Sequence, residues 1–190
     1  MRRRALLAAA GASMASLAGC LGASEYTITD VEVTSSAPFE FDVTITEPDA
    51  VIEHPALLEF ELTNRGDRPL RVRNTGVWPF GLLKLVPSLD TEGPAGALLW
   101  TEQYEASEHV DIESRRNYGT DSTSLVQALE SGERVSETYE LHGDGIREAD
   151  TAYVRGEFES PIFEYTRNDT DEWRSFSPEI AVTIVTKRLL

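Results

Sequence analysis

The sequence predicts an all-β protein with a single sandwich of about 7–9 antiparallel strands, preceded by a signal peptide. Two observations predict the sandwich. Apolar residues alternate with polar ones along most of the chain after residue 25, which is typical of strands with one buried face. Stretches rich in Gly, Pro, Asn and Asp separate these runs and indicate turns, while no segment has the apolar spacing of a convincing amphipathic helix.

The N-terminal segment has the features of an export signal. Arg2, Arg3 and Arg4 form a positive start, and residues 5–18 form a weakly apolar run of Ala, Leu, Gly, Ser and Met. This run is too short for a membrane span of about 20 apolar residues. A positive start, a short apolar run and small residues before a cleavage site are typical of secretory signals, so we expect residues 1–19 to be removed. Arg3 and Arg4, followed closely by two leucines, also resemble the arginine pair of twin-arginine signals, which export folded proteins.

A cysteine follows this signal directly. The segment Leu17–Cys20 reads Leu-Ala-Gly-Cys and resembles the lipobox of bacterial and archaeal lipoproteins. In that family the cysteine takes a thioether-linked lipid and becomes the first residue of the mature chain. The resemblance implies that Cys20 anchors the protein in the cell membrane at its extracellular face, with residues 20–25 as a tether and residues 26–190 as the folded domain. The alternative is an ordinary signal peptide that a cysteine follows by chance.

Acidic residues dominate the composition. The 190-residue chain has 17 basic and 33 acidic side chains and a formal charge of −16. The first nineteen residues contain three arginines and no acidic residue, so the remaining 171 residues carry 14 basic and 33 acidic side chains, a formal charge of −19. Nucleic-acid binding is disfavoured, because phosphate contacts need clustered Lys and Arg. Cys20 is the only cysteine, so no disulfide can brace the domain.

The distribution of these charges indicates an adaptation to salt. The acidic residues are scattered along the chain, and only Lys84 and Lys187 are lysines. This composition resembles that of proteins from salt-loving archaea. High salt screens the repulsion that such a charge would otherwise cause. The alternative is that the acidic residues form a binding surface.

The alternation of apolar and polar residues is clearest in the first half of the domain. Asn64–Pro69 is a dense turn signal that includes Arg65-Gly66-Asp67, a cell-adhesion tripeptide that we interpret here as a hairpin turn. The Pro- and Gly-rich residues 87–96 separate two shorter apolar runs. The expected strands, in chain order, are Tyr26–Val33 with an irregularity at Thr29-Asp30, Phe39–Ile45, Leu58–Leu62, a strand from Leu70, Gly81–Val86 and Ala97–Thr101.

The second half alternates less regularly. Residues 102–123 are polar and unpatterned, and we expect a loop or an insertion there. Leu125, Val126 and Leu129 have the spacing of one helical turn. His142–Gly145 lacks the run of oxygen ligands that a calcium loop needs, so a tight turn is favoured over a cation site. The other expected strands are Glu133–Leu141, Ala152–Phe158 and Ile180–Thr186.

Two short motifs indicate an immunoglobulin-like (Ig-like) version of the sandwich. Residues Leu129–Glu133 and Tyr139–Leu141 together resemble the "L-x-x-G-E … Y-x-L" run of archaeal and bacterial Ig-like modules. Asp150–Tyr153 resembles a tyrosine corner, in which the Tyr153 hydroxyl bonds to the chain upstream; an ordinary strand aromatic is the alternative. The resemblance implies a single Ig-like sandwich.

A second resemblance covers under a quarter of the chain. Residues Leu58–Val72, read with Leu129–Leu141, are similar to the intracellular proteinase inhibitor (BsuPI-like) family of β-sandwiches. In that family a strand similar to Phe60–Asn64 leads into a turn and a strand similar to Arg68–Val72. The stretch Asp90–Thr123 departs from the family pattern, so we carry over no inhibitor activity.

No motif in the sequence specifies a reaction. A nucleophile elbow, a phosphate-binding loop, a dinucleotide fingerprint and a paired metal motif are all missing. His54, His109 and His142 stand far apart, and a catalytic triad would need one of them beside a serine and an acid in space. We therefore expect no enzymatic activity, no cofactor and no metal. Asn168 begins an Asn-Asp-Thr acceptor for N-glycosylation, which requires a surface loop.

The remaining candidates concern binding. Trp78, Trp100 and Trp173 are candidate ligand-facing aromatics, with burial in the core as the alternative. Our leading expectation is a non-enzymatic cell-surface lipoprotein that serves as an interaction or accessory module for an unidentified protein partner. The alternative is a lipoprotein that binds a small ligand or substrate beside a transporter, which needs a deep pocket lined by these tryptophans.

Overall fold

The protein is described from a computed structural model that covers residues 25–91, 95–157, 161–167 and 172–187. Within these ranges the chain forms fifteen strands, and all paired strands are antiparallel. Eight of these strands have six or more residues, and seven are shorter. The expected all-β sandwich is confirmed. Two of the short strands lie within the expected strands Gly81–Val86 and Ala97–Thr101, whereas the other five were not predicted, because two to five residues contain too few alternations.

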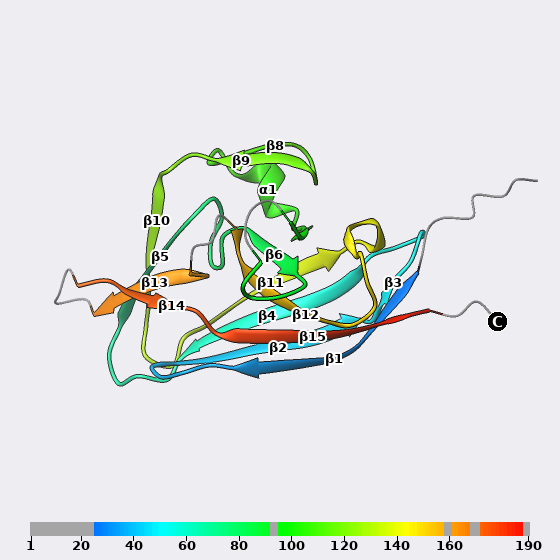
Figure 1. The fold of residues 1–190 in the computed structure, drawn as a ribbon. Helices are drawn as coiled ribbons and strands as arrows, with labels where there is room; N and C mark the ends of the chain where they lie inside the picture. Colours follow the sequence, from blue (N-terminus) through cyan, green and yellow to red (C-terminus); the bar gives the residue numbers. More distant parts are fainter. Residues whose placement is uncertain (1–24, 92–94, 158–160, 168–171, 188–190) are drawn as a thin grey trace, which may run out of the picture.

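Six strands form the largest sheet, in the order β3-β1-β15-β12-β6-β7 (Figure 1). β1 and β15 pair over nearly their full lengths, with a register shift between Ile28 and Asp30 where the sequence alternation breaks. The bounds are β1 Tyr26–Thr34, β3 Asp49–Ala50, β6 Leu83–Val86, β7 Ala97–Leu99, β12 Thr151–Gly156 and β15 Glu179–Thr186.

A second sheet has the order β11-β4-β2 and packs against the first sheet through the core. An isolated bridge joins the two sheets beyond β7, where the backbone N–H of Trp100 donates to the carbonyl of Glu140 at 2.9 Å and the reverse bond is 2.7 Å long. The bounds are β2 Phe39–Glu47, β4 Ala56–Asn64 and β11 Arg134–Leu141.

A third sheet has the order β10-β5-β13-β14 and lies at the left-hand end of the molecule in Figure 1. It begins where the chain leaves the second sheet, because β4 and β5 follow one another in sequence but belong to different sheets. The same is true of β10 and β11. The bounds are β5 Leu70–Thr75, β10 Ser124–Leu129, β13 Phe163–Arg167 and β14 Arg174–Phe176.

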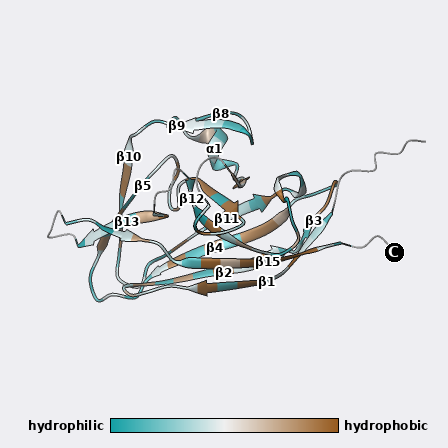
Figure 2. Ribbon diagram, viewed as in Figure 1, coloured by the Kyte–Doolittle hydropathy of each residue, from teal (hydrophilic) through white to brown (hydrophobic). Residues whose placement is uncertain are grey.

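The core lies between these sheets and consists of the inward-facing residues of each strand. Figure 2 shows hydrophobic and hydrophilic residues interleaved along the long strands, as period-two burial requires. Phe39 lies at the junction of the second and third sheets, with its ring centroid 5.3 Å from those of both Phe163 and Phe176. Fully buried side chains of this size each contribute about 1.5–3 kcal/mol, so core burial carries the stability of the sandwich.

Asn64 stabilises both chain segments that pass between the second and third sheets, from β4 to β5 and from β10 to β11. It is fully buried, and its Nδ2 donates to the carbonyls of Arg68 and Leu129, each at 2.9 Å. Its Oδ1 accepts from the backbone N–H of Gly66 at 2.9 Å, and its carbonyl accepts from the N–H of Gly132 at 2.8 Å. Residues 65–67 are therefore part of a crossing between sheets and not a hairpin turn, because β4 and β5 do not pair with each other.

The polar segment 102–123 contains ordered elements that rest on the core. Tyr104 is fully buried, and its hydroxyl donates to the carbonyl of Leu99 at 3.0 Å. Val110 is also buried, and Tyr118 packs against the core. A few apolar residues thus hold an otherwise polar insertion in place. The elements are α1 Gln103–Ala106 and the β8–β9 hairpin, in which β8 is Val110–Ser114 and β9 is Asn117–Thr120.

The helical turn predicted at Leu125–Leu129 is wrong. These residues form β10, which pairs with β5 from Ser124 opposite Thr75 to Leu129 opposite Leu70. Pairing with a strand more than fifty residues away overrides the local helical spacing of the apolar residues. The turn expected at 142–145 is confirmed as a short 3-10 helix, η1 (Gly143–Gly145).

Candidate functional site

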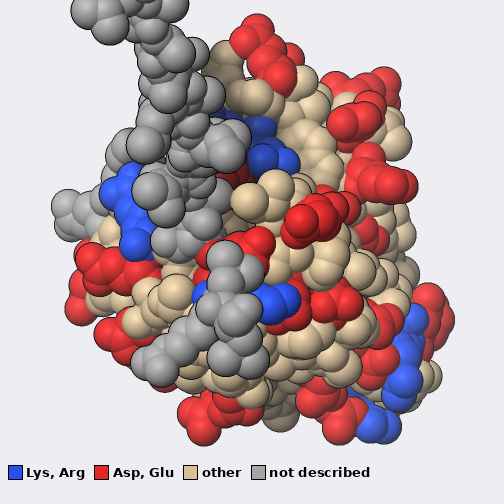
Figure 3. All heavy atoms as spheres, turned by 90° about the vertical axis from the view of Figure 1, so that its right-hand side faces the viewer, with Lys and Arg blue, Asp and Glu red and all other residues tan. Residues whose placement is uncertain are grey.

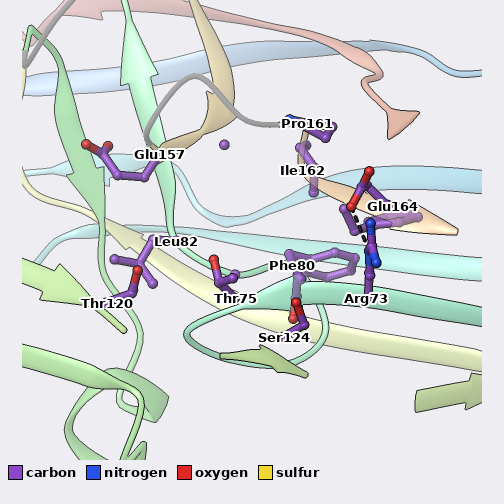
Figure 4. Close-up of a pocket in the computed structure, with 14 residues that line it drawn as sticks. Arg73, Thr75, Phe80, Leu82, Thr120, Ser124, Glu157, Pro161, Ile162 and Glu164 are labelled. Carbon is purple, nitrogen blue, oxygen red and sulfur yellow. Dashed lines mark hydrogen bonds and ion pairs between the residues drawn. The ribbon is translucent and has the colours of Figure 1, made fainter. Parts of the chain in front are cut away.

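A cavity of about 290 Å³ lies beside the end of β5 (Figure 4). On one side, Nε of Arg73 donates to Oε2 of Glu164 at 2.7 Å. Glu157 lies on the opposite side with its carboxylate turned away from that pair (Figure 4). The other walls of the cavity combine hydroxyl and apolar side chains from several elements, namely Thr75, Thr120, Ser124, Phe80, Leu82 and Ile162.

One wall of this cavity is shaped by Asn74. Its Nδ2 donates to the carbonyls of Val77 and Pro79, at 2.9 and 2.6 Å, and so holds the loop that follows β5. The same loop receives the Tyr139 hydroxyl, which donates to the Gly81 carbonyl at 3.0 Å. These bonds make the wall part of the rigid core.

Behind the cavity, Glu157 forms a buried ion pair with Lys84. The side chains are only 9% and 3% exposed, and Nζ of Lys84 lies 3.4 Å from both carboxylate oxygens. Lys84 also stands directly opposite Arg155 on the same face of the largest sheet. Nε and Nη2 of Arg155 are buried and have no hydrogen-bond partner in the described part of the chain. Among the described residues, this layer thus brings together Lys84, Arg155 and the Glu157 carboxylate.

Tyr118, from strand β9, covers the same layer. Burial, together with the negative charge of Glu157, raises the pKa of Tyr118 to about 12. The phenol is therefore protonated at neutral pH, and its hydroxyl donates to the Glu157 carboxylate.

A second recess, which we call the arginine hollow, lies on the other side of Glu157. It has a volume of about 420 Å³ and lies between the tip of the β8–β9 hairpin, the η1 loop and the start of β7. Arg115, at the hairpin tip, donates from Nη2 to both carboxylate oxygens of Asp144, at 3.2 and 3.1 Å. The residues that define the hollow are Gly96–Leu98, Arg115–Tyr118, His142, Asp144, Gly145, Arg147 and Glu157.

His142 supports Arg115 in this position. Its Nδ1 lies 3.1 Å from Nη1 of Arg115, and its Nε2 lies 2.7 Å from Oε2 of Glu140. Because a guanidinium only donates, Nδ1 accepts and Nε2 carries the proton that is donated to Glu140. Arg115 is thus oriented from two sides.

A third feature is the outer face of the sheet β10-β5-β13-β14. The guanidinium carbons of Arg71 and Arg73 lie 5.2 and 4.1 Å from the ring centroid of Trp173. Val126 stands opposite Arg73 in register and is 44% exposed. We call this surface, made of Arg71, Arg73, Val126 and Trp173, the Trp173 face. It lies at the end of the molecule opposite to Glu25, where the described domain begins (Figure 1).

The structure does not bring the three candidate tryptophans together. Trp78 and Trp100 are partly buried against the core, and the Trp100 ring packs edge-on against Tyr104 at 5.8 Å. Trp173 belongs to the Trp173 face. None of the three lines the β5 cavity or the arginine hollow. Their role in facing a ligand stays a prediction.

The three histidines have separate environments. Nδ1 of His54 lies 3.2 Å from the Pro55 carbonyl, and Nδ1 of His109 lies 3.0 Å from Oδ2 of Asp121. Ser107 is near His109, but its hydroxyl donates to the Gly76 carbonyl and accepts from the backbone N–H of His109. No histidine ring is hydrogen-bonded to a serine within the ranges described above.

Several predicted residues lie outside the described residues: Arg3, Arg4, Cys20 and Asn168. None of the helices that the structure describes has the length and hydrophobicity needed to cross a membrane.

Sequence reasoning missed the residues around Glu157. Lys84 interrupts the apolar run Gly81–Val86, and a lone charge in such a run is a signal of a paired buried group. Arg155 and Glu157 gave no comparable signal, because alternating charges are also typical of an exposed strand face. Only the pairing of β6 with β12 brings the three residues together.

Comparison with known proteins identifies the family of the chain but indicates no activity. No curated protein and no solved structure matches the chain. A family model described as a domain of unknown function, DUF8130, matches residues 1–190, the whole of the chain. The protein therefore belongs to the DUF8130 family.

Proposed function

We propose that this protein is a non-enzymatic lipoprotein of the cell surface that serves as an interaction module for a protein partner. In this proposal, the twin-arginine signal at Arg3 and Arg4 exports the domain already folded. A lipid on Cys20 then holds it at the extracellular face of the cell membrane. The dispersed acidic residues suit a salt-rich medium, as in proteins of salt-loving archaea.

The observation that carries the interaction role is the Trp173 face. Arg and Trp are the side chains most enriched among the residues that dominate binding energy at protein interfaces. Two guanidinium groups over one indole ring form a preorganised surface, and exposed cation–π contacts contribute about 0.5–1 kcal/mol each.

The position of this surface supports the same role. The first and last described residues meet at one end of the domain, where the backbone N–H of Lys187 donates to the Glu25 carbonyl at 2.7 Å. A tether at residues 20–25 would leave from that end, so the Trp173 face would point away from the membrane (Figure 1). Because Arg73 is paired there with Glu164, the face would offer a partner guanidinium and indole surface rather than uncompensated positive charge.

The anchor is tested by mass spectrometry of the mature N-terminus in wild type and in Cys20→Ser. We expect a lipid-modified Cys20 in the wild type and loss of the variant from the membrane fraction. An unmodified Cys20, or a variant that stays in the membrane fraction, would contradict the lipoprotein proposal.

The partner surface is tested by cross-linking at the surface of intact cells. The test variant is Arg71→Gln/Arg73→Gln, and the matched control is Arg65→Gln/Arg134→Gln. The control removes two exposed arginines that pair with Glu40 and Glu61 on another sheet. We expect a specific cross-linked product with wild type and control that is lost in the test variant. Equal products from all three proteins would exclude this surface.

A second candidate function is a small-ligand-binding lipoprotein beside a transporter. The arginine hollow favours it, because its volume of about 420 Å³ lies within the usual range of ligand pockets, about 300–1,000 Å³.

A further inference from the structure

We propose that the arginine hollow binds a small organic anion whose carboxylate or phosphate groups are held by Arg115, Arg116 and Arg147. The inference gives a ligand class to the second candidate function. It does not depend on a transporter, on the lipid anchor or on the Trp173 face, so these proposals can fail separately.

Basic side chains are concentrated around this hollow. The chain as a whole has a formal charge of −16, yet three arginines face this hollow together with two acidic residues, Asp144 and Glu157. In Figure 3, acidic side chains dominate the surface, and a few basic side chains gather in a recess near the top of the view. A local excess of arginine within an acidic surface focuses the electrostatic potential on anions.

One arginine of the hollow is already oriented by its neighbours, whereas the other two retain N–H donors that could bind a ligand. Arg115 is fixed by Asp144 and His142. Arg116 makes only long contacts with residue 144, at 3.4 Å to its carbonyl and 3.9 Å to its carboxylate. Arg147 is exposed and makes no hydrogen bond or ion pair within the described ranges. Guanidinium groups match carboxylates and phosphates through two parallel N–H donors, so Arg116 and Arg147 can close on such a group.

The inner end of the hollow is formed by buried charged side chains. Glu157 is neutralised there by Lys84 at 3.4 Å, and Arg155 adds a second buried cation on the same sheet face. Because Glu157 is already paired with Lys84, it does not repel a negative ligand as an unpaired carboxylate would. Tyr118, whose hydroxyl is hydrogen-bonded to Glu157, covers this inner end and leaves its ring toward the hollow.

The shape of the hollow favours an organic anion over a bare inorganic ion. The three arginines that line it are exposed to solvent, whereas Gly96–Leu98 contribute backbone and apolar surface to its wall. The anionic groups of a ligand would bind at these arginines, and its uncharged part would extend toward Tyr118.

The test is isothermal titration calorimetry of the whole mature protein with citrate and with glycerol 3-phosphate, at constant ionic strength set with KCl. The test variant is Arg116→Gln/Arg147→Gln, and the control is again Arg65→Gln/Arg134→Gln, which removes the same charge elsewhere. We expect saturable binding of at least one probe by wild type and control, weakened about tenfold or more in the test variant. Binding of citrate alone would assign a carboxylate ligand, and binding of glycerol 3-phosphate alone a phosphate ligand.

Two results would overturn the inference. One is the absence of saturable binding of both probes to the wild type. The other is an equal loss of affinity in the test variant and the control, which would show only a response to net charge. Because both test residues are exposed, circular dichroism and thermal unfolding should match the wild type and so confirm that the variant is folded.

Discussion

Asn64 is the residue on which the junction between two sheets depends. Its side chain bonds to three backbone groups, and its carbonyl bonds to a fourth, across two chain segments about 65 residues apart. A single buried amide thus replaces the ladder hydrogen bonds that both strands lose as they leave the second sheet. The junction in turn positions β5, from which Arg71 and Arg73 project.

We predict that Asn64→Ala lowers the free energy of unfolding by about 2–4 kcal/mol, because buried backbone groups lose their partners and a small cavity opens. Urea unfolding measures the change. The control is Asn117→Ala at the exposed hairpin tip, which should change stability by about 0.5 kcal/mol or less. Equal effects of the two substitutions would contradict the role assigned to Asn64.

A second prediction at this scale concerns the buried charges. Glu157→Gln removes the one carboxylate among Lys84, Arg155 and Glu157, so it should destabilise the protein by about 3–5 kcal/mol. Lys84→Met should cost less, because Arg155 remains as a cation near Glu157. Urea unfolding of both variants checks the order. A larger loss in the free energy of unfolding for Lys84→Met than for Glu157→Gln would show that Arg155 does not compensate the charge of Glu157.

At the scale of elements, the α1–β8–β9 insertion contributes to both recesses, through Thr120 to the β5 cavity and through Arg115–Tyr118 to the arginine hollow. Tyr104 and Val110 hold its base in the core, whereas Arg115 ties its tip to Asp144. Where the hairpin leaves the domain, His109 pairs with Asp121, and the backbone N–H of Asp121 donates to the His109 carbonyl at 3.2 Å. The insertion is thus fastened by polar contacts at its neck and tip.

The neck contact predicts a pH dependence of the hairpin. The hydrogen bond with Asp121 raises the pKa of His109 above 6.5, and the same bond lowers the pKa of Asp121 below 3.8. The raised pKa of His109 contributes stability to the folded form that is fully present below pH 6.5, and this contribution is lost as the pH rises through the raised value. The lowered pKa of Asp121 contributes stability that is present above pH 3.8, and this contribution is lost as the pH falls through the lowered value.

The hairpin should therefore be most protected between about pH 4 and pH 6.5 and less protected at higher pH. Amide hydrogen exchange of residues 108–121, corrected for the intrinsic effect of pH, measures this. In His109→Gln the decrease at higher pH should vanish. A decrease that persists in this variant would assign the effect to another group.

For the whole molecule, the dominant physical fact is the excess of acidic residues. Asp42 and Glu61 stand directly opposite each other on the outer face of the β11-β4-β2 sheet, an arrangement of like charges that is unfavourable in dilute salt. With no disulfide available, core burial must exceed this repulsion.

We predict that the free energy of unfolding rises as KCl increases from 0.1 to 1 M, because the screening length falls from about 10 Å to about 3 Å. Thermal unfolding at several KCl concentrations measures the rise. Asp42→Asn should be more stable than the wild type at low salt and show a smaller rise. Stability that is independent of KCl would contradict the proposed adaptation to salt.

Sequence patterns predicted the faces of the long strands, because alternation is set by the pleat and is local. Phe60 and Leu62 in β4 are fully buried, as their spacing indicates. The same reasoning failed at Leu125–Leu129, where the helical spacing is accidental and pairing with β5 decides the conformation. It also missed Tyr104, because one apolar residue within a polar segment makes no pattern.

The sequence by itself determined the all-β class and the buried faces of the long strands other than β10, since each depends on residues close together in the chain. The export signal and the lipid anchor at Cys20 are predictions of the same local kind. Only the tertiary structure decided which strands share a sheet and that residues 65–67 form a crossing between sheets. It also decided that Lys84, Arg155 and Glu157 share one buried layer and that Arg115 and Arg147 face one hollow. The physical reason is that these features depend on contacts between residues far apart in sequence, which chain closure and packing select and no local pattern encodes.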